Sequence, residues 1–378
     1  MSQRWLGGWV VVVMLLVCED AGAIIRRHDR EDARYLELAA KHTAVTRLGG
    51  GAATLVAPQW VLTAAHVAAN LSPFQSAVRF NDRVYAIEGI VIHPRSRTRP
   101  RPQAVDLALI KLAEPVHGVT PLGIYAKDDE KGQPILFVGP GMFGDGLSGP
   151  KGDDGRMRAA TNTVAGVLEN YITFTFDAPP EGTELEGISG PGDSGGPALL
   201  EADGQTFVIG VSSANDDEGA AGPCRYKSTE YYARVSTAGE WIRTTTESEV
   251  APRGSLAETI DLRTGSWPDS RAGRIAAAFF ESYARATDEA METFEKTYRA
   301  ESALRDRPVE DRVESWRTYR AEWGALEAHK CLVDGDGDLQ VLVRAKGEGV
   351  WKSFRFELEA GEPHKLTGIA VDSPVEVE

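Results

Sequence analysis

Short apolar or alternating segments, separated by Gly, Pro and Asp, dominate the chain from about residue 24 to residue 241. Runs of about four to eight β-forming residues between such turn-forming clusters are typical of antiparallel strands. We therefore predict an all-β barrel or sandwich over this part, closed by a helix that begins near Glu240. The clearest predicted strands are residues 53–56, 84–87, 107–110, 135–138 and 207–211.

The periodicity changes after residue 270. Apolar residues then recur three or four positions apart, which is the spacing of one face of an α-helix. Alternating strands follow at 339–343, 354–358 and 365–371. Helices followed by hairpin strands predict a small α+β domain in which the helices cover one face of an antiparallel sheet. The two predicted helical faces consist of Ile275, Phe279, Tyr283, Ala286, Ala290 and Phe294, and of Val313, Trp316, Tyr319, Trp323 and Leu326.

The first residues have the organisation of a secretory signal peptide. Arg4 precedes an apolar run from Trp5 to Cys18, and small residues suited to cleavage follow at Ala21-Gly22-Ala23. The run is short for a membrane-spanning helix. We predict that residues 1–23 are removed and that the protein is secreted or periplasmic, with no membrane attachment after cleavage. An uncleaved anchor and a lipid on Cys18 are the alternatives.

The remaining chain divides into two predicted domains and a linker. Residues 247–270 lack a sustained apolar period and contain Pro and Gly at intervals, which indicates the linker. The β domain then covers residues 24–246, and the α+β domain covers residues 271–378. Only Cys224 and Cys331 follow the predicted signal peptide, and they either pair with each other or stay reduced.

The charge of the chain restricts its partners. Its 378 residues include 41 Lys and Arg against 56 Asp and Glu, a formal net charge of −15. Binding to a nucleic-acid backbone requires clustered Lys and Arg, so nucleic acid is not an expected partner. No metal is expected either. Residues 334–338 (Asp-Gly-Asp-Gly-Asp) imitate the start of a calcium loop but lack the remaining ligands, so they predict a hairpin turn.

Three motifs in the β domain contain residues suited to nucleophilic catalysis. A serine hydroxyl is a weak nucleophile near neutral pH, so it needs a base, and imidazole is the side chain best suited to take its proton. A buried carboxylate then holds the imidazole in the required tautomer. Each motif alone also fits a loop, a strand start or a core histidine. The motifs are Thr63-Ala64-Ala65-His66, Asp106-Leu107-Ala108-Leu109-Ile110 and Gly192-Asp193-Ser194-Gly195-Gly196-Pro197.

With these motifs in this order, the segment from Ile24 to about Trp241 resembles the chymotrypsin/trypsin serine peptidase family. The resemblance implies two six-stranded antiparallel barrels and a trypsin-like serine endopeptidase that forms an acyl-enzyme. It implies Ser194 as nucleophile, His66 as general base and Asp106 as the orienting carboxylate. The backbone N–H groups of Gly192 and Ser194 would form the oxyanion hole. The implied partner is a protein or peptide substrate, and no cofactor is implied.

The resemblance also implies a maturation step. Cleavage after Ala23 would leave Ile24 as the new N-terminus, and members of the family pair such an ammonium with the aspartate before the nucleophile, here Asp193. Signal removal itself would then order the site. In the alternative, Asp193 binds only the amides of its own loop.

Primary specificity is left open between two interpretations. The resemblance places Ile188 at the floor of the pocket, so the carboxylate that would favour Arg or Lys is absent there. It places Ser212, Ala214 and Glu230 along the walls. An inward Glu230 would restore a charge-assisted contact to a basic side chain. If Glu230 turns to solvent, the pocket is small and apolar and suits short aliphatic side chains.

Two departures from the family concern its disulfides. Val67 and Gly190 stand where members commonly have cysteine, so packing alone must hold these loops.

Two rival functions also remain, a secreted binding protein that keeps the peptidase scaffold and a serine esterase. The C-terminal domain is similar, in element order alone, to the small α+β cones of ketosteroid isomerase and nuclear transport factor two. It contains no catalytic constellation, so we expect an accessory role with an unknown ligand.

Overall fold

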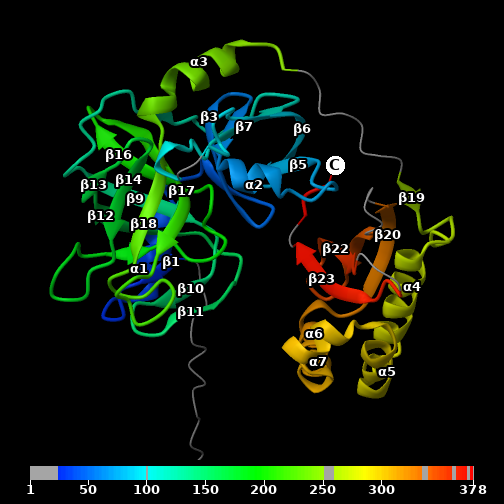
Figure 1. Cartoon of the computed structure of the whole chain (residues 1–378). Helices are drawn as coiled ribbons and strands as arrows, with labels where there is room; N and C mark the ends of the chain where they lie inside the picture. Colours follow the sequence, from blue (N-terminus) through cyan, green and yellow to red (C-terminus); the bar gives the residue numbers. More distant parts are fainter. Residues whose placement is uncertain are drawn as a thin grey trace, which may run out of the picture.

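The computed structural model describes residues 24–98, 101–250, 259–333, 339–359, 363–372 and 375–377. The chain forms a β-rich N-terminal unit and a C-terminal unit of helices and strands (Figure 1). The predicted signal peptide with Cys18, residues 251–258 of the predicted linker and the turn at 334–338 lie outside the described residues. None of the helices in the described part is long and apolar enough to cross a bilayer.

The first barrel consists of six antiparallel strands: β2 (Val45–Leu48), β3 (Gly51–Ala57), β4 (Trp60–Thr63), β5 (Ala77–Phe80), β6 (Arg83–Ile92) and β7 (Ala108–Leu112). Their order in the sheet is β2-β3-β4-β7-β6-β5. The Thr46 hydroxyl in β2 donates a hydrogen bond to the carbonyl of Arg79 in β5, which brings the two edges together. Helix α2 (Ala65–Ala69) follows β4, and the 3-10 helix η1 (Arg101–Gln103) precedes β7.

The second barrel contains eight strands: β8 (Gly123–Ile124), β9 (Pro134–Gly139), β12 (Arg158–Thr163), β13 (Gly166–Val167), β14 (Tyr171–Thr175), β16 (Pro197–Ala202), β17 (Gln205–Asp216) and β18 (Thr229–Arg234). The main order is β12-β9-β16-β17-β18-β14-β13, and β8 pairs in parallel with β17. The predicted fold class is confirmed, with β8 and β13 as additions to the six strands expected. The 3-10 helix η2 (Ser236–Ala238) and helix α3 (Gly239–Glu247) end this domain, as the pattern near Glu240 predicted.

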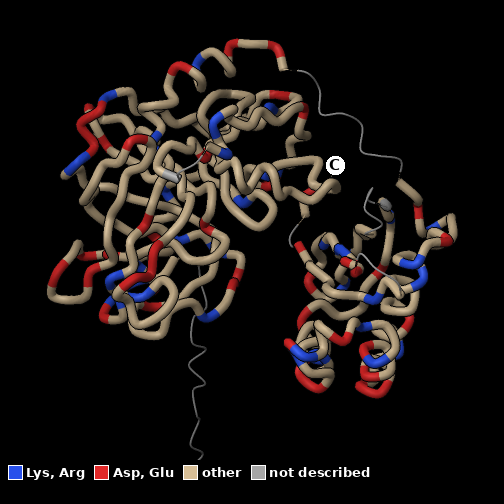
Figure 2. Tube along the Cα trace, in the orientation of Figure 1, with Lys and Arg blue, Asp and Glu red and all other residues tan. Residues whose placement is uncertain are grey.

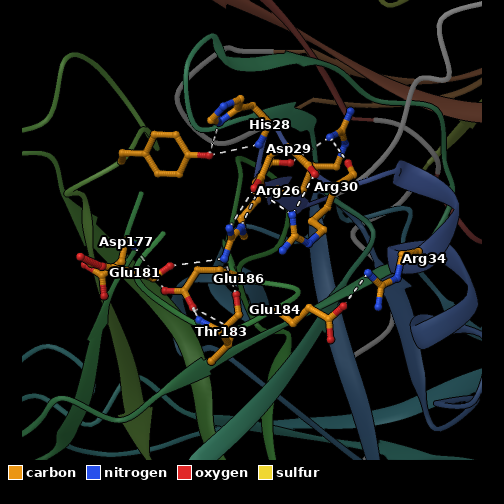
Figure 3. A network of polar contacts seen from close by, with 12 residues as sticks. Arg26, His28, Asp29, Arg30, Arg34, Asp177, Glu181, Thr183, Glu184 and Glu186 are labelled. Atoms are coloured by element: carbon orange, nitrogen blue, oxygen red, sulfur yellow. Dashed lines mark hydrogen bonds and ion pairs between the residues drawn. The ribbon is translucent and has the colours of Figure 1, made fainter. Parts of the chain in front are cut away.

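A further small sheet holds the start of the described chain in place. It comprises β1 (Ile24–Arg26), β10 (Phe143–Asp145), β11 (Gly149–Gly152) and β15 (Gly187–Ile188), in the order β11-β10-β1-β15. Just after β1, the Arg27 guanidinium binds both oxygens of Asp29 at 2.9 Å and donates to the carbonyl of Thr183 at 2.8 Å. Polar side chains around Thr183 and Glu186 continue this network (Figure 3). Helix α1 (Asp32–Ala39) follows.

The C-terminal unit is a five-stranded antiparallel sheet with helices packed on it. The sheet order is β19-β20-β21-β22-β23, and Phe279 of the first helix contacts the rings of Phe354 and Phe356 in the sheet. The elements are β19 (Ile260–Asp261), α4 (Arg271–Ala284), α5 (Asp288–Tyr298), α6 (Glu301–Asp306), α7 (Val309–Trp323), β20 (Leu326–Val333), β21 (Leu339–Ala345), β22 (Val350–Leu358) and β23 (Leu366–Asp372). The likeness to ketosteroid isomerase stays a prediction.

Three details of this unit differ from the sequence pattern. Ala286 adopts a left-handed backbone (φ +57°) between α4 and α5, so the first predicted helical face is split over two helices. Helix α7 ends at Trp323, before Gly324 (φ +67°), and Leu326 therefore begins a strand instead of extending the helical face. Strand β19 lies within the predicted linker and pairs with β20.

Each domain has its own hydrophobic core, and neither core uses a disulfide. Cys224 is buried in the β domain and Cys331 in the C-terminal domain, and both are free thiols. Lys and Arg are interspersed with Asp and Glu along the coloured tube in Figure 2.

Candidate active site

His66 and Asp106 meet at the end of the first barrel because their strands are neighbours. Thr63, the last residue of β4, pairs with Ala108, the first residue of β7, so the residues just beyond these ends lie side by side. His66 Nδ1 lies 2.7 Å from Asp106 Oδ2, and the His66 backbone N–H donates to Asp106 Oδ1 at 3.0 Å. The imidazole is 39% exposed and the carboxylate 13% exposed, so the ring faces solvent while its partner is enclosed.

Ser213 is a site residue that the sequence interpretation missed, although it considered both neighbours. Its hydroxyl donates to Asp106 Oδ2 at 2.5 Å. It occupies a β-bulge, since Ser212 pairs with Tyr232 and Ala214 with Tyr231. A bulge re-aims a side chain in a way that alternation along a strand does not predict. Burial would raise the pKa of Asp106, but the hydrogen bonds from His66 and Ser213 outweigh it, and the pKa is lowered.

Ser194 lies in the loop between β15 and β16, and it lines the same cavity of about 190 Å³ as His66. The Ser194 carbonyl accepts a hydrogen bond from Ala52 N–H at 2.8 Å, which ties this loop to the first barrel. Glycine is required beside it at position 51, because a Cβ there would lie 2.6 Å from the Ser194 carbonyl oxygen. The Val67 side chain packs against the same position. Van der Waals packing is thus present at Val67, where members of the family commonly have a disulfide.

The loop around Ser194 presents unused N–H groups. Gly192 has φ +94°, a conformation that favours glycine. Within the described part of the chain, the N–H groups of Gly192 and Ser194 have no hydrogen-bond acceptor, whereas Gly195 N–H donates to Ser212 at 2.9 Å. Two such donors next to a serine hydroxyl suit a developing oxyanion.

Asp193 is 1% exposed and holds its loop through backbone amides. Its carboxylate accepts hydrogen bonds from Gly141 N–H at 2.7 Å and Gly190 N–H at 2.8 Å. Burial nevertheless raises the pKa of Asp193 to about 7, partly offset by these two N–H groups. A carboxylate in this state is stabilised by a nearby cation.

Ile24 is the first residue of β1, and the two strands that pair with β1 flank the loop of Asp193. It is 1% exposed, and β1 pairs in parallel with β10, just after Gly141, and antiparallel with β15, just before Gly190. Its backbone has φ +66°, which is an outlier for a β-branched residue. The predicted partners Ile24 and Asp193 are thus brought to adjacent elements.

The residues predicted for the specificity pocket come from three strands. Ile188 in β15 is fully buried, and Ser212 in β17 is 4% exposed. Glu230 in β18 is 2% exposed, so the alternative in which it turns to solvent is wrong. Its Oε2 has no hydrogen-bond partner within the described part of the chain. Burial, and then repulsion from Asp193, raise the pKa of Glu230 well above its ordinary value.

Nothing in the described ranges resembles a metal centre, because no three His, Cys, Asp or Glu side chains converge there. The site offers the hydroxyl of Ser194, the imidazole of His66 oriented by Asp106, and the two N–H groups of the Ser194 loop. Groups of these kinds are suited to hydrolysis by a serine nucleophile.

Comparison with protein families agrees with this class. The profile of the Trypsin family matches residues 37–242, more than half of the chain, and the chain belongs to this family. Among solved structures, it is similar to neuropsin, a serine protease from mouse brain, with 19% identity and a TM-score of 0.44 over 55% of this chain and 96% of that one. A search of curated proteins found no match.

Proposed function

We propose that this protein is a secreted serine endopeptidase that cleaves peptide bonds through Ser194, His66 and Asp106. The observation that carries the proposal is the 2.7 Å contact between His66 Nδ1 and Asp106, in a trypsin-family chain whose Ser194 lines the same cavity as His66. Secretion follows from the predicted removal of residues 1–23.

In the proposed reaction, Ser194 Oγ bonds to the scissile carbonyl carbon while His66 takes its proton. The N–H groups of Gly192 and Ser194 donate to the oxyanion that forms. His66 then passes the proton to the leaving nitrogen, the C–N bond breaks, and an ester to Ser194 remains. Water, deprotonated by His66, hydrolyses this acyl-enzyme and restores the serine. Asp106 keeps Nδ1 protonated, so that Nε2 is the basic nitrogen throughout.

The proposal is tested by labelling with a fluorophosphonate probe, which reacts with activated serines. Purified protein that begins at Ile24 is expected to be labelled, and the Ser194→Ala variant is expected not to be. Labelling that survives Ser194→Ala would contradict the assignment, and an unlabelled folded wild type would favour the binding-protein alternative. Cleavage of esters but not of peptides would favour the esterase.

We further propose that Glu230 selects Arg or Lys before the scissile bond. Its buried Oε2 lacks a hydrogen-bond partner in the described part of the chain, and neither of the other predicted wall residues, Ser212 and Ala214, carries a positive charge. A guanidinium or ammonium that entered would form a charge-assisted hydrogen bond and lower the pKa of this carboxyl.

Glu230→Gln is therefore expected to lower kcat/KM for a peptide with Arg before the cut by about 10- to 100-fold, as loss of a charged hydrogen bond implies. The measurement is kcat/KM for otherwise identical peptides with Arg or Ala at that position, and the Ala peptide is the control. Equal or better cleavage after Arg in the variant would rule out the carboxylate as the determinant.

A further inference from the structure

The last described residues of the chain join the two domains. Ser76 N–H donates to the Glu376 carbonyl at 3.0 Å, and Glu376 N–H donates to the Gln75 side chain at 3.1 Å. The Glu376 carboxylate also receives two hydrogen bonds from the Arg79 guanidinium, at 3.0 and 2.8 Å. Figure 1 shows this end of the chain beside β5. The C-terminal segment 375–377 therefore binds directly to the first barrel.

An apolar cluster supports the same contact. Phe74 of the first barrel is 3% exposed and packs in one cluster with Val375 and with Leu342 of β21. Val375 N–H donates to the Trp351 carbonyl in β22 at 2.9 Å, so the segment is also tied to the C-terminal sheet. Buried apolar area of this kind fixes the C-terminal domain beside the loop that follows α2.

This docking brings the C-terminal domain to the candidate active site. Asp372, the last residue of β23, and Val375 line the cavity that contains His66 and Ser194. The predicted pocket residues Ile188 and Glu230 are not among the described residues that line this cavity. The cavity is therefore separate from the predicted specificity pocket, which receives the residue before the scissile bond, and it is available to the part of a substrate that follows this bond.

A larger groove of about 670 Å³ adjoins this cavity, because Gly49 lines both. The first barrel contributes Arg47 and Arg79 to the groove, and the C-terminal domain contributes Trp323, Glu322 and other residues of α7 and β22. The groove is thus built by both domains, and Ser194 is not among the described residues that line it.

The groove has an excess of negative charge beside aromatic rings. Five carboxylates and three cations line it. Each cation has a carboxylate partner: Arg47 pairs with Asp153 at 3.0 Å, Arg79 with Glu376 at 2.8 Å, and Lys352 with Glu348 at 2.6 Å.

Two of the five carboxylates are left: Asp154 of the β domain, which pairs with Arg158 at 3.4 Å and with Arg156, and Glu322 of the C-terminal domain. Glu322 is exposed to solvent, and partial burial, followed by a hydrogen bond with and repulsion from the Glu348 carboxylate, raises the pKa of Glu322. A further cation beside these two carboxylates would relieve their repulsion. The Tyr319 and Trp323 rings stack with centroids 4.4 Å apart, and Lys352 Nζ already lies 4.5 Å from the Trp323 centroid. Carboxylates next to aromatic faces suit guanidinium and ammonium groups.

We propose that this interdomain groove binds the segment of a protein substrate that follows the scissile bond, and that it selects basic residues there through Glu322 and Glu348. The inference rests on the proposed peptidase function, since the groove meets substrate only if Ser194 is the nucleophile. The C-terminal domain would then determine specificity on the leaving-group side.

The test uses internally quenched peptides that are identical up to the cut and carry Arg, Ala or Glu at each of the third to sixth positions after it. At one or more of these positions, the ratio of kcat/KM for Arg to that for Ala is expected to be about 5 to 10, as pairs of this kind imply. Glu322→Gln/Glu348→Gln is expected to bring this ratio close to one. The ratio is formed within each variant, so the amount of folded enzyme cancels.

The matched control is Glu310→Gln/Glu314→Gln, which removes two charges from exposed positions on the same helix outside the groove. This control is expected to keep the wild-type ratio. A wild-type ratio of one at all four positions, or an unchanged ratio in Glu322→Gln/Glu348→Gln, would overturn the inference. A second substrate separates the two proposals. It is a peptide coumarin amide in which the bond to coumarin is the scissile bond, so no peptide residue enters the groove. If the wild type does not cleave this substrate, the proposed peptidase function itself is contradicted.

Discussion

Replacing Ser194 with Ala is expected to lower kcat/KM for peptide hydrolysis by about 10⁴- to 10⁶-fold. The substitution removes the atom that bonds to the substrate and leaves the cavity walls in place. His66→Ala is expected to cause a loss of similar size, because Ser194 is unreactive without its base. The double variant is expected to lose little more than either single variant, since the two groups act as a unit.

The measurement is kcat/KM on a peptide with Arg before the cut, together with the melting temperature of each variant. Ser148→Ala, at an exposed position in the β domain, is the matched control and is expected to keep wild-type activity. Retention of more than one per cent of the activity in Ser194→Ala, with contaminating protease excluded, would contradict the proposed mechanism.

An extra residue before Ile24 is expected to lower activity by about 10²- to 10³-fold, the loss that breaking a buried ion pair implies. In the longer chain the Ile24 nitrogen is an amide and carries no charge. Asp193 then remains without an ammonium partner, and its pKa stays near 7. In the maturation that we propose, a free Ile24 ammonium pairs with this carboxylate. It would also relieve the φ of +66°, because the clash arises from the preceding carbonyl group.

The comparison uses one preparation that begins at Ile24 and one that carries a removable Gly before it. Trimming the Gly is expected to restore activity and fluorophosphonate labelling. Asp193→Asn serves as a second variant and is expected to be weakly active with either N-terminus. Equal activity before and after trimming, with both forms folded, would contradict this maturation step.

The pH dependence of stability provides a second readout of the same pair. In the extended form, folded Asp193 keeps its proton up to about pH 7, whereas the unfolded chain releases it near its ordinary value of 3.8. A raised carboxyl pKa therefore makes the free energy of unfolding fall as the pH rises through this window. The trimmed form, with the carboxylate paired, is expected to lack this decline.

Local sequence was enough to predict the class of the fold. Alternating and apolar runs between Gly, Pro and Asp identified the strands, because each side chain in a strand reports which face it occupies. The change to helical spacing after residue 270 identified the second domain. The chemistry of the site was also readable, since Ser194, His66 and Asp106 each lie in a recognisable motif, and β4 and β7 bring two of them together.

The sequence pattern was less informative where backbone geometry departs from regular elements. Alternation along β17 gives no indication that a bulge turns Ser213 toward Asp106. The helical spacing through Ala286 continues without interruption, although the backbone there leaves the helix. Such positions depend on local φ and ψ, which the order of apolar and polar residues does not encode.

By itself, the sequence determined the β and α+β classes of the two domains and the residue types of the candidate site. The tertiary structure alone decided what surrounds that site. The burial of Glu230 and the placement of Ile24 next to the loop of Asp193 result from pairing between distant strands. The hydrogen bond from Glu376 to Gln75, next to which Val375 lines the cavity of His66, brings together residues about three hundred positions apart. Contacts over such separations depend on how whole domains pack, and periodicity within one segment has no information about them.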